Sequence, residues 1–175
     1  FEFPEADKPI IKALQLPASY AISPNLEQID EVVHRLKIAM DNGIELIQLR
    51  VPKVPESDIR AAANQLLTHA AQYPKVKLLL NRDIDLAQSI GFHGVHLSAK
   101  QLLTLNQSSI GYGFWTSASC HDIDELHLAE SKDVDFVVLS PVLPTATHPD
   151  ATALGWDNFQ KLVSQVNLPV YALGG

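Results

Sequence analysis

The chain has 175 residues, of which 46% are hydrophobic and 19% charged, a composition that supports one packed core and excludes a disordered or low-complexity polymer. The formal charge of −7 argues against a general binder of nucleic acids or anionic membranes, which needs a basic face. One cysteine, Cys120, cannot form an intrachain disulfide, and no stretch reaches the roughly 20 apolar residues of a membrane span. We therefore expect a cytoplasmic protein.

The N-terminal segment has the composition of connecting sequence. It is rich in acids, lysines and prolines, and it lacks the apolar centre of a signal peptide. We expect residues 1–17 to be a linker from a possible upstream domain, and residues 18–175 to form one domain.

From residue 18 onward, short apolar runs alternate with segments in which apolar residues recur at helical spacing. The runs are typical of parallel strands covered on both faces, and they predict seven strands, at 19–23, 45–50, 76–81, 94–97, 114–119, 136–142 and 170–173.

Six helices are predicted between the strands. The first carries an apolar stripe from Ile29 to Met40, with Asn25 as its cap and Gly43 as its end. Another follows Asp122, with Glu125 completing a capping box. The remaining four are expected after Ser57, at 84–90, at 100–105 and around 159–166.

Seven strands alternating with six helices fit either an open doubly wound α/β sheet or a TIM (β/α)₈-type barrel. The first strand is followed by Ser23-Pro24-Asn25 rather than by a Gly-x-Gly-x-x-Gly turn, which removes the main support for a dinucleotide-binding sheet. The barrel is favoured, with its eighth βα unit absent from this sequence.

Polar residues gather at the carboxyl ends of the predicted strands, which in a barrel open on the face that carries the active site. Arg50 offers a planar fork for phosphate, and Gln48 lies on the same side of its strand; the alternative is an ion pair between Arg50 and a nearby acid. Gly174 and the loop around Thr145, Thr147 and His148 suit phosphate oxygens, although a simple turn explains them equally.

Two further residues admit more than one role. His121 follows the fifth strand at the start of a helix, where it either moves a proton or helps to cap the helix. His96 alternates along its strand and is either a core hydrogen-bonding residue or a site residue, whereas Cys120 is expected to be a small packing residue.

Several short motifs occur together in one order, and through them the chain resembles the thiamine-phosphate synthase family and its thiazole tautomerase relatives over about residues 18–175. The motifs are Tyr20-Ala21-Ile22, Gln48-Leu49-Arg50, Leu80-Asn81, Asp85-Leu86-Ala87, Gly94-Val95-His96-Leu97, Ser119-Cys120-His121, Pro141-Val142-Leu143-Pro144-Thr145-Ala146-Thr147 and Gly174-Gly175.

The resemblance implies a TIM barrel that couples hydroxymethylpyrimidine diphosphate to hydroxyethylthiazole phosphate, releasing diphosphate and forming thiamine phosphate. It also implies Mg²⁺ as a cofactor that neutralises the leaving group. Carried over to this sequence, the resemblance implies that Gln48, Arg50 and Asn81 contact the pyrimidine diphosphate. It implies that Ser119 and Thr147 help to hold the diphosphate. Thr145 and Gly174 would contact the thiazole phosphate.

The sequence departs from the family's pattern at the acidic and basic positions. Asn81-Arg82-Asp83 stands where the family reads Asn-Asp-Arg, so that Asp83 is a displaced metal ligand, and Gln101 replaces a second metal-binding acid. Lys53 is displaced by one residue from the family's lysine, and His148 replaces another lysine that contacts diphosphate. One hypothesis is that Arg82 substitutes electrostatically for the metal.

Two alternatives remain open beside the synthase. One is a thiazole phosphate tautomerase in which His121 shuttles a proton. The other is a non-catalytic sensor or partner domain that binds the phosphorylated ligands without turning them over. The N-terminal segment also resembles the linker that follows a Nudix-type hydrolase in fusion proteins with this barrel.

Overall fold

The computed structural model describes residues 16–26, 28–81, 83–106, 110, 113–144 and 152–174. Within them, strands and helices alternate as the sequence predicts. The strands are β1 (Tyr20–Ile22), β2 (Leu46–Leu49), β3 (Lys77–Leu80), β4 (Gly94–Leu97), β5 (Trp115–Cys120), β6 (Phe136–Leu139) and β7 (Val170–Ala172). The helices are α2 (Ile29–Asp41), α3 (Glu56–Ala70), α4 (Ile84–Ser89), α5 (Ala99–Leu103), α6 (Ile123–Ser131) and α7 (Gly155–Val163).

The chain forms two compact units, and each repeats the same βα pattern. One unit consists of residues 17–96 and 111–115, and its strands β1, β2, β3 and β4 pair in parallel in chain order. The other consists of residues 1–16, 97–110 and 116–175, and it contains the parallel strands β5, β6 and β7. Parallel pairing throughout confirms the predicted α/β class.

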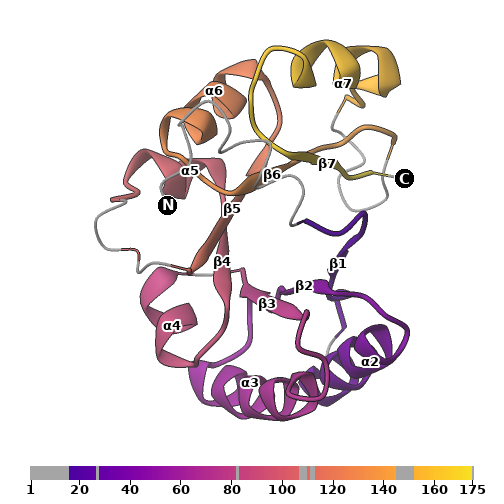
Figure 1. Ribbon diagram of the computed structural model, residues 1–175, viewed down its shortest axis with the longest axis vertical. Coiled ribbons are helices and arrows are strands. Elements are labelled where there is room, and N and C mark those ends of the chain that lie inside the picture. The colour runs from indigo at the N-terminus through magenta and orange to yellow at the C-terminus, as the bar shows by residue number, and fades with distance from the viewer. Residues whose placement is uncertain are drawn as a thin grey trace. The chain divides into compact units, whose positions relative to one another are not determined.

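Each unit buries its strands beneath helices. β2 and β4 are buried along their whole length, and Figure 1 shows α2, α3 and α4 on one side of β1–β4 and α5, α6 and α7 on one side of β5–β7. Helix α2 turns its predicted stripe inward, with Val32, Val33, Leu36 and Met40 all buried. In the described ranges no helix is long and apolar enough to cross a membrane.

Many element ends differ from the predicted ones by one or two residues, and the larger differences are at α2, β6 and α7. Asn25 does not cap α2: the N-cap is Gln28, which makes no side-chain cap bond, and Asp30 and Glu31 complement the helix dipole instead. β6 ends at Leu139 rather than residue 142, because Pro141 has no backbone N–H to continue the ladder. Helix α7 ends before Val166, at Val163.

A histidine side chain pairs β3 with the turn before β4. His93 N–H donates to the Leu78 carbonyl at 2.9 Å, and the Leu78 N–H donates to His93 Nδ1 at 3.0 Å. Nδ1 accepts this bond only while it carries no proton. Burial, with the Lys77 ammonium nearby, lowers the pKa of His93 below its ordinary value of 6.5.

This arrangement predicts a loss of stability in mild acid. The unfolded chain binds a proton at His93 more readily than the folded chain, so the stabilisation is complete above pH 6.5 and declines as the pH falls toward the lower folded pKa. His93→Asn, whose Oδ1 accepts the same bond without titrating, is expected to lose about 1 kcal/mol less than the wild type between pH 7 and pH 5. Urea unfolding at several pH values measures this difference, and parallel pH profiles for the two proteins would contradict the prediction.

Candidate active site

The strands β1 to β4 place a row of polar side chains on one face of their unit. The register sets Ile22 beside Gln48 and Leu80 beside Val95. Because side chains alternate along a strand, Tyr20, Gln48, Asn81 and His96 share a face. Gln48 and His96 are 1% and 2% exposed, among predominantly apolar core residues.

Hydrogen bonds link this row from strand to strand. Asn81 Nδ2 donates to Gln48 Oε1 at 3.1 Å, and Gln48 Nε2 donates to the Tyr20 hydroxyl at 2.8 Å. That hydroxyl lies 3.4 Å from His96 Nδ1. The two amide bonds join neighbouring strands, whereas the Tyr20–His96 contact links β1 with β4, so the amides of Gln48 and Asn81 are held in fixed directions.

The same row contains a histidine that stays neutral. Burial, and then the nearby Arg50 guanidinium, lowers the pKa of His96 to about 3. At physiological pH His96 is therefore a hydrogen-bonding partner and not a positive charge. Of its two predicted roles, the structure supports that of a core hydrogen-bonding residue.

Arg50 follows β2 with its backbone fixed and its side chain exposed. Its N–H donates to Ser23 Oγ at 2.7 Å, and the Ser23 hydroxyl donates to its carbonyl at 3.0 Å. Among the residues that the structure describes, no acid forms an ion pair with the Arg50 guanidinium. The predicted anion contact thus has a backbone anchor within the unit that holds Gln48 and Asn81.

The expected metal ligand has another role. Asp83 is the N-cap of α4, and its Oδ1 accepts the Leu86 N–H at 2.7 Å. Gln101, at the second expected acidic position, closes a capping box on α5, and its Oε1 accepts both the N–H and the hydroxyl of Ser98 at 2.9 Å.

The resemblance to the thiamine-phosphate synthase family implies Mg²⁺ as a cofactor. Mg²⁺ in proteins is held by carboxylates together with substrate phosphates. Nowhere in the described part of the chain do three His, Cys, Asp or Glu residues come close enough to hold a metal ion. The described residues therefore form no all-protein cage for a metal ion.

The second unit contains a histidine paired with a carboxylate. Asp122 caps α6 by accepting the Glu125 N–H at 2.9 Å, as predicted. The predicted return bond goes elsewhere: Glu125 Oε2 accepts the His121 N–H at 2.8 Å and lies 2.9 Å from His121 Nδ1. A carboxylate only accepts, so Nδ1 carries the hydrogen in neutral His121 and Nε2 carries the lone pair.

The neighbouring Cys120 is not a nucleophile. It is buried, and burial, with Glu125 and Asp122 adding to the effect, raises the pKa of its thiol to about 12. This agrees with the packing role predicted from the sequence. The adjacent Ser119 lies in β5 and is partly exposed.

Gly174 lies where only a glycine fits. Its φ is 137°, and a Cβ there would come within 2.8 Å of Val142 N and 2.9 Å of the Leu143 carbonyl oxygen. The chain after β7 therefore passes closely beside the chain after β6, and this backbone packing accounts for the glycine. The other predicted site residues lie outside the described residues: Arg82, Thr145, Thr147 and His148.

The structure thus groups Gln48, Arg50 and Asn81 in one unit, whereas Ser119, His121 and Gly174 belong to the other. Sequence reasoning missed the Tyr20 hydroxyl as the third member of the hydrogen-bonded row. Its signal was only partly available: Tyr20 lies in the first predicted strand, but only the register of β1 with β2 places it on the face of Gln48.

Comparisons with known proteins agree with these features. The family profile described as "Thiamine monophosphate synthase" matches residues 19–175. A putative thiamine-phosphate synthase 2 from Aquifex aeolicus is 28% identical over 162 residues, covering 93% of this chain and 87% of that protein. A thiamine-phosphate synthase from Methanobrevibacter smithii is 27% identical, covering 89% of this chain and 75% of that protein.

Solved structures give the fold. A thiamine phosphate pyrophosphorylase from Pyrococcus furiosus has a TM-score of 0.73 at 24% identity, covering 89% of this chain and 74% of that one. The likeness confirms the expected TIM-like α/β fold. A match that begins at residue 19 and runs through every described strand places the chain in the thiamine monophosphate synthase family.

Proposed function

We propose that this protein makes thiamine phosphate by joining hydroxymethylpyrimidine diphosphate to hydroxyethylthiazole phosphate. The family binds phosphorylated pyrimidine and thiazole substrates. The observation that carries the proposal for this chain is the Tyr20–Gln48–Asn81 hydrogen-bonded row, which fixes two side-chain amides on one face beside the anchored Arg50.

In the first unit, an amide supplies both donors and acceptors, which is what a pyrimidine ring with ring nitrogens and an amino group requires. Gln48 and Asn81 are therefore proposed to hold the pyrimidine diphosphate, with the Arg50 guanidinium on its diphosphate. Ser119, Thr147 and His148 are proposed to contact the diphosphate as well. Thr145 and the Gly174 backbone are proposed to receive the thiazole phosphate.

The reaction exchanges one bond for another. The bond between the pyrimidine methylene carbon and the diphosphate oxygen breaks, and the thiazole nitrogen bonds to that carbon. Negative charge accumulates on the departing diphosphate, so groups that are positive before the reaction starts lower its barrier. Arg50 is suited to this role because its backbone is fixed by Ser23.

The changes at the family's acidic positions predict a reaction that does not require Mg²⁺. The described residues form no all-protein cage for a metal ion, and Arg82, next to Asn81, is proposed to supply the positive charge to the diphosphate in place of Mg²⁺. Mixing both precursors with the folded protein is expected to yield thiamine phosphate at an undiminished rate after exhaustive chelation. Arg82→Gln is expected to lower the rate at least tenfold, whereas Arg35→Gln, on the exposed face of α2, leaves it unchanged.

Quantified thiamine phosphate, with and without added Mg²⁺, is the measurement. Strict dependence on Mg²⁺ would overturn the proposed role of Arg82. Absence of product from folded protein that binds both precursors would overturn the synthase itself.

A second candidate activity is favoured by the His121–Glu125 pair. Glu125 fixes the tautomer of His121, so that Nε2 is the base and the imidazolium that forms is stabilised by the carboxylate. His121 is also 55% exposed at its side chain, so the ring is open to a small molecule. This arrangement suits a tautomerase that moves a proton during aromatisation of a thiazole phosphate.

A tautomerase role for His121 predicts which substitutions lower the rate of tautomerisation. His121→Ala is expected to reduce tautomerisation by a factor of 100 or more while ligand binding persists, because the proton carrier is gone. Glu125→Gln is expected to cause a smaller loss, since its oxygen still accepts from Nδ1. His127→Ala, an exposed histidine on the same helix, is the control. Equal rates in His121→Ala and His127→Ala would exclude this activity.

A further inference from the structure

Helix α4 is too short to be stable by itself. It has six residues, Ile84–Ser89, and buries only Leu86 and Ala87. An isolated helix of this length does not form in water, because nucleation costs more than so few hydrogen bonds return. Contacts at its ends therefore contribute to its position, together with the burial of Leu86 and Ala87.

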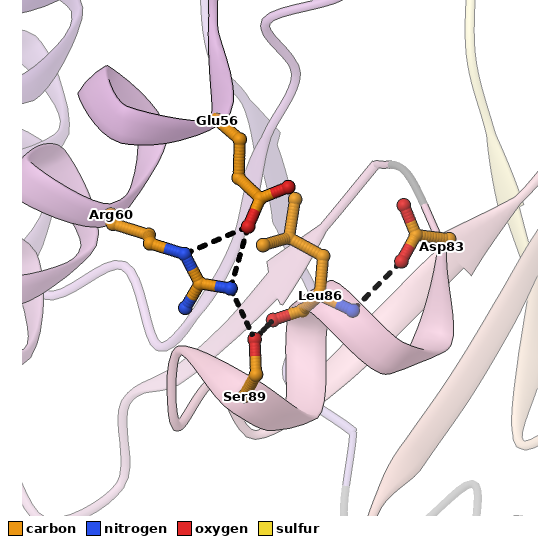
Figure 2. Close-up of polar contacts among 5 residues, drawn as sticks. All are labelled: Glu56, Arg60, Asp83, Leu86 and Ser89. Atoms are coloured by element: carbon orange, nitrogen blue, oxygen red, sulfur yellow. Dashed lines mark hydrogen bonds and ion pairs between the residues drawn. The ribbon is translucent and has the colours of Figure 1, made fainter.

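Both ends of α4 are tied by side chains (Figure 2). At the N-terminal end, Asp83 Oδ1 accepts the Leu86 N–H at 2.7 Å. At the C-terminal end, Ser89 Oγ donates to the Leu86 carbonyl at 3.0 Å and accepts from Arg60 Nη2 at 3.0 Å.

Arg60 is itself held in place on α3. Its Nε and Nη2 donate to Glu56 Oε1 at 2.8 and 2.6 Å, one helical turn earlier. The guanidinium therefore joins a long helix to the short one. A fifteen-residue helix with five buried residues provides a firm base for α4.

The capped end of α4 lies next to the hydrogen-bonded row. Asn81 is anchored on its other side, because its N–H donates to the Leu49 carbonyl at 2.9 Å. Only one residue separates Asn81 from Asp83, and two Cα atoms so close in sequence cannot be more than about 7 Å apart. Fixing Asp83 on α4 thus limits where the Asn81 side chain can lie.

We propose that Asp83 is a positioning residue and not a metal ligand: as the N-cap of α4 it helps to hold Asn81 where its amide meets the pyrimidine diphosphate. This inference rests on the proposed synthase function for its substrate. It follows from the contacts of Asp83, whose carboxylate accepts a backbone N–H, and from the described residues around it, which form no group of three metal-ligating side chains.

Substitution of Asp83 by alanine and by asparagine distinguishes a capping role from a metal-binding role. Asparagine caps a helix about as well as aspartate, whereas alanine does not, and only aspartate brings the charge that a magnesium ligand needs. The Leu86 amide is expected to exchange with solvent roughly fivefold faster in Asp83→Ala and at the wild-type rate in Asp83→Asn. Asp85→Ala, which removes an exposed carboxylate from the same turn, serves as the control for charge.

Kinetics with both precursors give the second readout. In Asp83→Ala, KM for the pyrimidine diphosphate is expected to rise severalfold while KM for the thiazole phosphate stays unchanged, and Asp83→Asn restores the wild-type value. Ser89→Ala, which breaks the tie to Arg60 at the far end of α4, is expected to raise the same KM by a smaller factor.

Two results would overturn the positioning role. One is a Leu86 amide that exchanges equally fast in Asp83→Ala and wild type. The other is an Asp83→Asn variant that binds Mg²⁺, in a calorimetric titration with the metal alone, at least tenfold more weakly than the wild type. Failure of the synthase itself is recognised separately, because wild-type protein would then make no product while the exchange measurement still reports on the cap.

Discussion

The structure of the first unit depends on the requirement that a buried amide find partners for both of its ends. Gln48 is 1% exposed in the middle of a buried strand, where an unsatisfied amide would cost about 1–3 kcal/mol. Its oxygen accepts from Asn81 and its nitrogen donates to Tyr20, so the amide orientation follows from its neighbours. Three strands are thereby set in one register with their polar atoms aimed in defined directions.

The candidate site of the second unit relies on a histidine–carboxylate pair instead of buried amides. There an exposed histidine is oriented by a glutamate on the next helical turn, and the pair suits proton transfer. The first unit instead offers neutral donors and acceptors, with a histidine kept uncharged by burial and by Arg50. A molecule that is both aromatic and anionic fits the first arrangement, and a molecule that must gain and lose a proton fits the second.

Much of the fold could be predicted because apolar residues recur in the sequence at the spacing of strands and helices. Short apolar strands and the stripe of α2 are visible in the sequence, and the period of two predicts that Gln48 and Arg50 lie on one side of their strand. The motif pattern likewise identified the family. Element ends were less certain, as Asn25 and Pro141 show, because caps depend on where the chain enters and leaves.

The hydrogen-bond partners of side chains were harder to predict than the placement of residues in strands and helices. Glu125 has the spacing of a capping box, yet its carboxylate reaches one residue further back and orients His121. Asp83 is a residue type that binds metal ions, yet it caps α4, a helix that has almost no stability of its own. In both cases the same side chain suits more than one partner, and only the folded backbone decides between them.

The central claim is that the row from Tyr20 to Asn81 binds the pyrimidine diphosphate. Calorimetric titration of that compound into the wild type and into Gln48→Leu tests it directly, with Gln65→Leu on the exposed face of α3 as the matched control. We predict at least a tenfold loss of affinity in Gln48→Leu, because the amide contacts are removed and Asn81 loses its partner. Equal affinity in the two folded variants would contradict the account.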